Sequence, residues 1–67
     1  MTFHDRLRAL MMSHGDDESA LAKRAGVPYI EIVALSTHPW EKTPVWIMCA
    51  ICEAYDVSLD FLVRGKR

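Results

Sequence analysis

The sequence predicts an all-α fold, a compact bundle of about five short helices in one domain over residues 1–67. Apolar residues recur every three or four positions in the segments between glycines and prolines, and no pair of segments alternates as strands do. Hydrophobic residues make up 51% of the chain and charged residues 25%, a balance typical of a folded domain. Because 67 residues bury only a small core, each helix must contribute an apolar face to it.

The first helix is expected from about Phe3 to Ser13. Thr2 precedes it and Asp5 follows three residues later, the spacing of a capping box. Gly15 then ends the helix. Its apolar positions share one face: Phe3, Leu7, Leu10 and Met11.

Two further short helices are expected on either side of a tight turn. One covers about 17–25, with carboxylates at its start and two cations in its last turn, as the helix dipole favours. Gly26 supplies a left-handed exit from it. The next helix begins at Pro28 or Tyr29, where proline loses no hydrogen bond, and continues to about Ser36.

The C-terminal part is expected to hold a loop over 37–42 and two more helices. Thr43 and Pro44 open the first of these as cap and first residue, and it runs to about Tyr55. Ser58 caps the last, which Gly65 closes. The expected buried stripe of the longer helix is Val45, Met48, Cys49, Cys52 and Tyr55, with Ile51 beside it.

The paired short helices carry the signature of a helix-turn-helix. Ala22 is small enough for two helices to cross closely, and Gly26 makes the corner between them. The apolar positions expected to lock the helices together are Leu21, Val27, Ile32 and Leu35. With the ending VSLDFL at 57–62, the chain resembles the lambda-repressor and Cro-like helix-turn-helix family over about residues 3–66.

This resemblance implies a small transcriptional regulator of phage or mobile-element type, binding double-stranded operator DNA, usually as a homodimer. In the family the third helix lies in the major groove and the start of the second lies over phosphate. The positions that match the base-facing ones are Tyr29, Ile30, Glu31, Val33 and Ala34, in the helix that Pro28 opens. The positions that match the phosphate-facing ones are Asp17, Glu18, Thr37, His38 and Lys42.

A second hypothesis comes from the chemistry of these positions. Between Pro28 and Ser36 there is no basic residue and no amide, and residues 15–38 hold four carboxylates against two cations, a net charge of −2. Glutamate can accept a hydrogen bond from cytosine N4, and apolar groups can contact the thymine methyl. Acidic and apolar character nevertheless also suits a protein partner, as in an antiactivator or antirepressor.

The hypothesis of a protein partner is favoured by large apolar residues at positions that the family usually leaves polar. These residues are Ile30, Val33, Trp40, Trp46 and Ile47. Tryptophan is enriched at binding hot spots. The two tryptophans equally suit a role in covering a thin core, and a homodimer interface is a further use of the same residues. Cations outside the motif that can reach a DNA backbone, or simply lie in solvent, are Arg6, Arg8, Arg64, Lys66 and Arg67.

No pattern points to an enzyme, a cofactor or a metal. Cys49 and Cys52 form a C-x-x-C, which is found in zinc sites and in redox sites. A structural zinc needs four ligands and no second pair exists. A redox C-x-x-C usually lies at a helix start near a strand, whereas this pair lies in the middle of an expected helix, so both thiols are expected to pack in the core. No nucleophile has an evident activating partner, and no small-molecule substrate is indicated. The chain shows neither a secretion signal nor a membrane span, which predicts a cytoplasmic protein with reduced thiols and no membrane partner.

Overall fold

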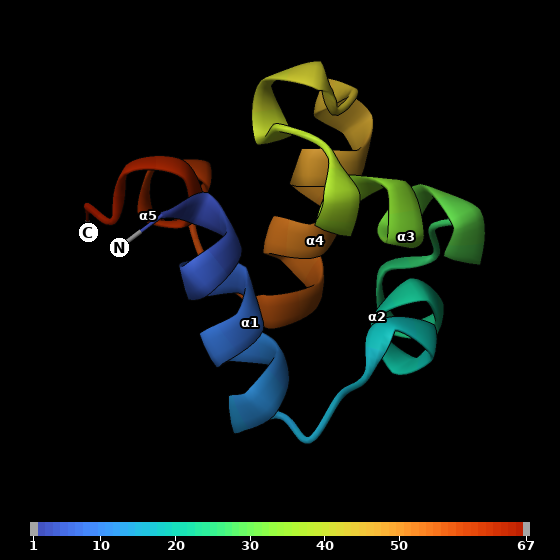
Figure 1. Cartoon of the computed structure of the whole chain (residues 1–67). Coiled ribbons are helices and arrows are strands. Elements are labelled where there is room, and N and C mark those ends of the chain that lie inside the picture. The colour runs from blue at the N-terminus through green and yellow to red at the C-terminus, as the bar shows by residue number, and fades with distance from the viewer. Residues whose placement is uncertain (1, 67) are drawn as a thin grey trace.

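Five α-helices and one short 3₁₀ turn, with no strand, make up residues 2–66, the part of the chain that this computed structural model describes. The all-α prediction is therefore confirmed. Figure 1 shows α4 in the centre, with α1 and α5 on one side of it and α2 and α3 on the other. The elements are α1 (Phe3–Ser13), α2 (Glu18–Ala25), α3 (Tyr29–Thr37), η1 (Trp40–Lys42), α4 (Val45–Tyr55) and α5 (Leu59–Arg64).

Side-chain caps fix the beginnings of three helices. The Thr2 hydroxyl accepts from the Asp5 amide and the Asp5 carboxylate accepts from the Thr2 amide, each at 3.2 Å, so the predicted capping box is confirmed. Asp17 caps α2 by accepting from the Ala20 amide at 2.8 Å. Ser58 caps α5 in the predicted way.

The start of α4 differs from the prediction. Pro44 is itself the N-cap of α4, with no side-chain cap bond, and Thr43 closes η1 instead of capping α4. The expected loop over 37–42 thus contains a turn of 3₁₀ helix. The reason is that Pro44 has an extended backbone, φ −57° and ψ 142°, which does not continue into the helix.

The corner between α2 and α3 forms at Gly26, as predicted. Its φ of 70° and ψ of 33° are left-handed, and a Cβ built there would meet nothing within 4 Å. A side chain at this position would therefore be opposed by backbone strain alone, about 1–2 kcal/mol. Beyond the corner, Val27 turns into the core and its amide donates to the Ala22 carbonyl at 3.0 Å.

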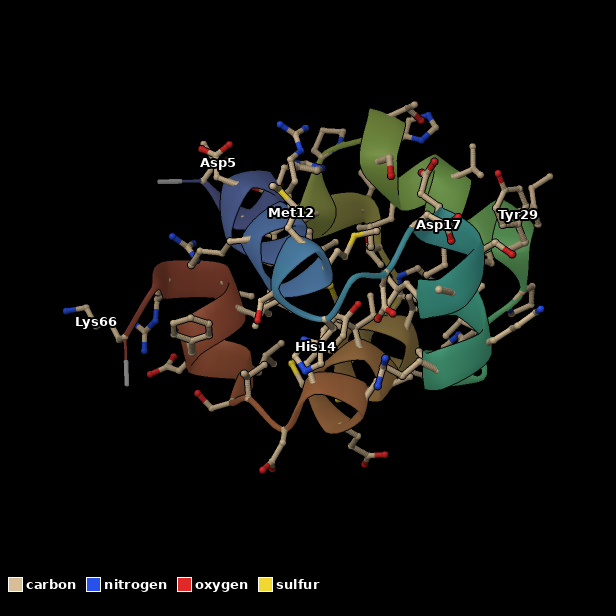
Figure 2. All side chains as sticks on the ribbon, turned by 90° about the horizontal axis from the view of Figure 1, so that it is seen from below. Asp5, Met12, His14, Asp17, Tyr29 and Lys66 are labelled. Atoms are coloured by element: carbon tan, nitrogen blue, oxygen red, sulfur yellow. The ribbon has the colours of Figure 1, made fainter. Side chains whose placement is uncertain are left out.

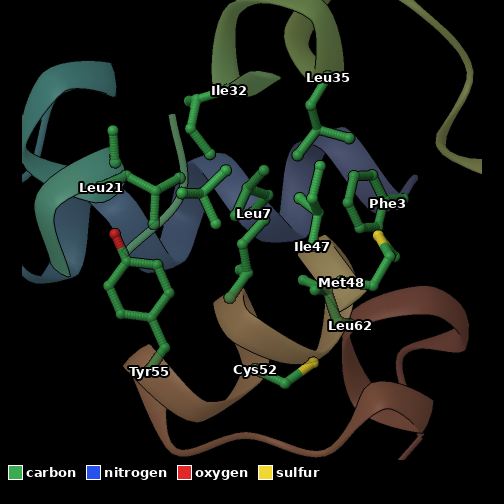
Figure 3. Close-up of a cluster of buried hydrophobic side chains, with 13 residues drawn as sticks. Phe3, Leu7, Leu21, Ile32, Leu35, Ile47, Met48, Cys52, Tyr55 and Leu62 are labelled. Carbon is green, nitrogen blue, oxygen red and sulfur yellow. The ribbon is translucent and has the colours of Figure 1, made fainter. Parts of the chain in front are cut away.

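The core lies where α1, α2, α3 and α5 meet α4. Figure 3 shows Leu21 of α2 and Ile32 and Leu35 of α3 converging on Leu7 of α1, with Tyr55 of α4 below them. Leu21, Ile32 and Leu35 are buried, which confirms the expected locking positions. Phe3 and Leu62 close the other end of the same cluster.

The predicted stripe of α4 is partly wrong. In the structure, the buried residues of α4 are Ile47, Met48, Ile51, Cys52 and Tyr55. Val45 and Cys49 are exposed instead. The first half of α4 is apolar on every side, so periodicity did not identify the buried face, and contacts with α2 and α5 decide it.

Arg6 is a buried cation that sequence reasoning assigned to the solvated surface. Its Nε donates to the Leu62 carbonyl at 2.8 Å and its Nη2 donates to the Val63 carbonyl. These are carbonyls of the last turn of α5, which have no partner inside the helix. Arg6 therefore joins α1 to the end of α5, against Gly65, where an added Cβ would lie 3.1 Å from its Nη1.

None of the helices between residues 2 and 66 combines the length and the apolar composition that crossing a membrane requires.

Arg6→Met should lower the free energy of unfolding by about 2 kcal/mol, because it removes charge-assisted hydrogen bonds to buried carbonyls and keeps the apolar stem. Urea unfolding followed by circular dichroism measures the change. Arg8→Met, at an exposed position of the same helix, is the matched control and should change it by less than about 0.5 kcal/mol. Equal effects of the two variants would contradict the assigned role of Arg6.

Candidate functional site

The outward side of α3 is the candidate site, and we call it the α3 face. Ile32 and Leu35 point inward and are buried, so the rest of the helix is turned away from the core. Tyr29 and Ile30 in its first turn are 55% and 73% exposed. In Figure 2 Tyr29 lies at the outer edge of the molecule, on the side opposite Lys66. The residues of the α3 face are Tyr29, Ile30, Glu31, Val33, Ala34 and Thr37.

The α3 face combines apolar contact area with a single carboxylate. Val33, Ala34 and Glu31 are half-buried, while Thr37 is exposed. The Thr37 hydroxyl lies 3.2 Å from the Ala34 carbonyl, so it bonds back to its own helix. The face can therefore offer methyl groups, a phenol and one carboxylate to a ligand, and no side-chain cation.

A shallow hollow of about 250 Å³ separates α3 from the start of α4. It brings together four of the predicted site residues, namely Glu31, Ala34, His38 and Lys42. Its other lining residues are Leu35, Thr43, Pro44 and Ile47. Lys42 belongs to η1 and not to α3. Because it lines this hollow with Glu31 and Ala34, its cationic side chain lies at the edge of the α3 face.

His38 follows α3 and is exposed. Its Nδ1 lies 2.9 Å from the Ala34 carbonyl oxygen, a distance at which a protonated Nδ1 donates. Nε2 is then the ring nitrogen left to contact a ligand. The ring is held in place by this bond, beside the hollow that Lys42 also lines.

The start of α2 holds two carboxylates that bond within the protein. Asp17 is occupied by the Ala20 amide. Glu18 is half-buried and accepts from the Ser36 hydroxyl at 2.7 Å, joining the start of α2 to the end of α3. Glu18, predicted as a phosphate-side contact, therefore braces the two helices through this hydrogen bond.

The apolar cluster proposed from the sequence is only partly at the surface. Ile47 is buried, so its predicted exposure is wrong. Trp40 is half-buried, and its ring centroid lies 6.2 Å from that of Phe3, which is the core-covering role that the sequence left open. Trp46 is exposed together with Val45 at the start of α4. Pro28, also predicted as a contact, is exposed at the start of α3.

A polar cluster that links the turn before α2 to the end of α4 was not predicted from the sequence. The Asp16 carboxylate accepts from Arg24 Nε at 2.7 Å and from the Tyr55 hydroxyl at 2.8 Å. The His14 ring lies against Tyr55, with centroids 4.7 Å apart. The only sequence signal was Tyr55 itself, because a tyrosine at the end of an apolar stripe needs a partner for its hydroxyl.

This cluster shifts the titration of its members. Hydrogen bonds from Arg24 and then Tyr55 lower the pKa of Asp16 below its ordinary value. Burial, followed by the Asp16 carboxylate, raises the pKa of Tyr55 well above its usual range. Asp16 is therefore a carboxylate and Tyr55 a neutral donor at neutral pH, and together they tie the turn before α2 to the end of α4.

The cysteines differ in environment. Cys52 is buried, whereas Cys49 is exposed, so the expectation that both pack in the core is wrong for Cys49. Among residues 2–66, no group of three or more potential ligands is arranged to hold a metal ion.

Searches against protein-family models, curated proteins and solved structures find no match to this chain.

Acid should destabilise the fold through Asp16. A carboxyl whose pKa is lowered by folding stabilises the protein above its unfolded pKa, near 3.8, and this contribution is lost as the pH falls toward the folded value. The free energy of unfolding should thus fall with pH below about 4, and Asp16→Asn should flatten that slope. Denaturant unfolding at a series of pH values measures it. Asp60→Asn, which removes an exposed ion pair with Arg64, should leave the slope unchanged, and a slope that Asp16→Asn also leaves unchanged would refute the role of this cluster.

Proposed function

We propose that this chain is a small helix-turn-helix regulator of transcription that binds operator DNA through the α3 face and is not an enzyme. The observation that carries the proposal is the orientation of α3. Ile32 and Leu35 lock its inner side, while Tyr29, Ile30 and Thr37 on its outer side are exposed. A short helix presented in this way has the size and accessibility to enter a major groove.

The side chains of the α3 face suggest how it would read bases. The methyl groups of Ile30, Val33 and Ala34 suit contacts with the thymine C5 methyl. Glu31 suits acceptance of a hydrogen bond from cytosine N4. We therefore expect the operator to present thymine and cytosine to α3, because the arginine and amide groups that read guanine and adenine are absent from it.

Contacts with phosphate would come from the edge of the face. Lys42 and His38 lie beside the hollow between α3 and α4, where a DNA strand next to the groove would pass. Each neutralised phosphate contributes about one unit to the salt dependence of binding. Because few cations lie near the α3 face, we expect the slope of log affinity against log salt concentration to be small.

DNA binding is tested by a mobility-shift titration with the duplex upstream of the chain's own reading frame, at low and moderate salt. Lys42→Ala should weaken binding to all sequences and reduce the slope of log affinity against log salt by about 1. Lys23→Ala, an exposed lysine on the last turn of α2, is the control and should change neither. Absence of any shifted complex at low salt would refute DNA binding.

A second candidate function, regulation through a protein partner, is favoured by the exposure of Tyr29 and Ile30. Large apolar groups this exposed are typical of interface cores. The carboxylates of Asp17 and Glu18 near the other end of the α3 face would attract a partner with basic residues around an apolar surface, and would repel phosphate.

The second candidate is tested with Ile30→Asp. A partner that co-purifies with the chain from its native host should be lost with this variant, with binding at least about thirtyfold weaker, because a charge would replace an anchoring apolar side chain. Met12→Asp is the matched control, since Met12 on α1 is 74% exposed and Ile30 is 73% exposed. Unchanged circular dichroism of both variants would establish that they fold. Equal binding by the two variants, or loss of the partner on nuclease treatment, would contradict the proposal.

A further inference from the structure

The C-x-x-C of α4 joins an exposed thiol to a buried one. Cys49 is exposed, while Cys52 is 7% exposed and belongs to the core cluster with Met48 and Ile51. Both are free thiols on the same helix, one turn apart. The expected packing role does not account for the exposure of Cys49.

We propose that Cys49 and Cys52 are a thiol-exchange pair, in which Cys49 reacts with a low-molecular-weight disulfide and Cys52 resolves the product into a disulfide within α4. The site is assigned from the placement of the two thiols, and it does not depend on whether the α3 face binds DNA or protein.

Helix geometry brings the two residues close, but not into an unstrained disulfide. A rise of 1.5 Å per residue on a cylinder of radius 2.3 Å places Cα atoms three positions apart at about 5 Å, inside the range that disulfides span. The Cβ atoms of such a pair are about 5–6 Å apart, whereas a disulfide brings them to about 3.8 Å. The bond therefore requires the turn between Cys49 and Cys52 to tighten.

The order of reaction follows from exposure. The Cys49 thiolate attacks one sulfur of the small disulfide, forms a mixed disulfide with it and releases the other half as a thiolate. Cys52, as its thiolate, then attacks the Cys49 sulfur and displaces the second half. Two protein thiols and one small disulfide thus become one protein disulfide and two small thiols. Burial, and then the neighbouring Cys49, raise the pKa of Cys52, so Cys52 is the poorer first nucleophile.

The consequence for the fold comes from the neighbours of Cys52. To bond Cys49, its sulfur must turn away from the core cluster that it now helps to fill. The helix α4 contacts both α2 and α5, so a tightened turn in α4 disturbs the support of the α2–α3 pair. Oxidation is therefore expected to lower the stability of the whole domain and to be reversed by reductant.

The experiment uses oxidised glutathione on the full chain at mildly alkaline pH, followed by intact mass measurement and thermal unfolding. The wild type should lose two hydrogens without keeping a glutathione, and its Tm should fall by about 4–8 °C and recover with dithiothreitol. Cys52→Ala should accumulate one glutathione at Cys49, because the resolving thiol is gone. Cys49→Ser should neither lose hydrogens nor gain glutathione.

Four outcomes would contradict the proposal. A wild type that stays fully reduced would show that Cys49 does not react with the small disulfide. A wild type that retains glutathione as Cys52→Ala does would show that Cys52 does not resolve the mixed disulfide. Disulfides found only between two chains would show the same. An internal disulfide that leaves the Tm unchanged would show that oxidation of the pair does not lower the stability of the domain. Because Cys49→Ser changes an exposed side chain, its folding provides the reference for all four.

Discussion

The turn at Gly26 is the constraint on which the rest of the arrangement depends. Its left-handed backbone ends α2 and lets the chain turn through Val27 into α3 within three residues. The small side chain of Ala22 leaves room for the two helices to lie close. Ile32 and Leu35 then pack in the core, so the opposite side of α3 faces outward. The exposure of the α3 face is thus a consequence of packing. The packing does not fix which side chains the face carries.

Long-range polar contacts join the helices of the bundle to one another. Glu18 bonds Ser36 across the ends of α2 and α3, Asp16 joins the turn before α2 to Tyr55 on α4, and Arg6 joins α1 to the carbonyls of α5. Each of these groups is occupied within the protein. The charged groups that remain for a ligand near the α3 face are few, which makes apolar contact the main resource of this surface.

Local signals allowed most of the fold to be predicted, and contacts distant in sequence account for most of what was not. The caps at Thr2 and Ser58 and the glycine exits fixed helix ends, because they act over three or four residues. The buried side of α4 could not be chosen, since apolar residues surround its first half, so Ile47 and Cys49 were each placed on the wrong side. The burial of Arg6 depends on a partner 56 residues away, which periodicity does not report.

For the candidate site, exposure of Tyr29 and Ile30 was predictable from the positions of Ile32 and Leu35 on the same helix. That Lys42 lines the same hollow as Glu31 and His38 was not predictable, because it depends on the path of η1. What the surface binds remains a prediction.

The most direct test of the account is a backbone amide map of the ¹⁵N-labelled chain by NMR, recorded while its own upstream duplex is added. The account predicts that the largest shifts fall on residues 28–38 and on Lys42, with α1 and α5 little changed. Shifts centred on α1 or α5, with α3 unperturbed, would contradict the assignment of the α3 face as the recognition surface.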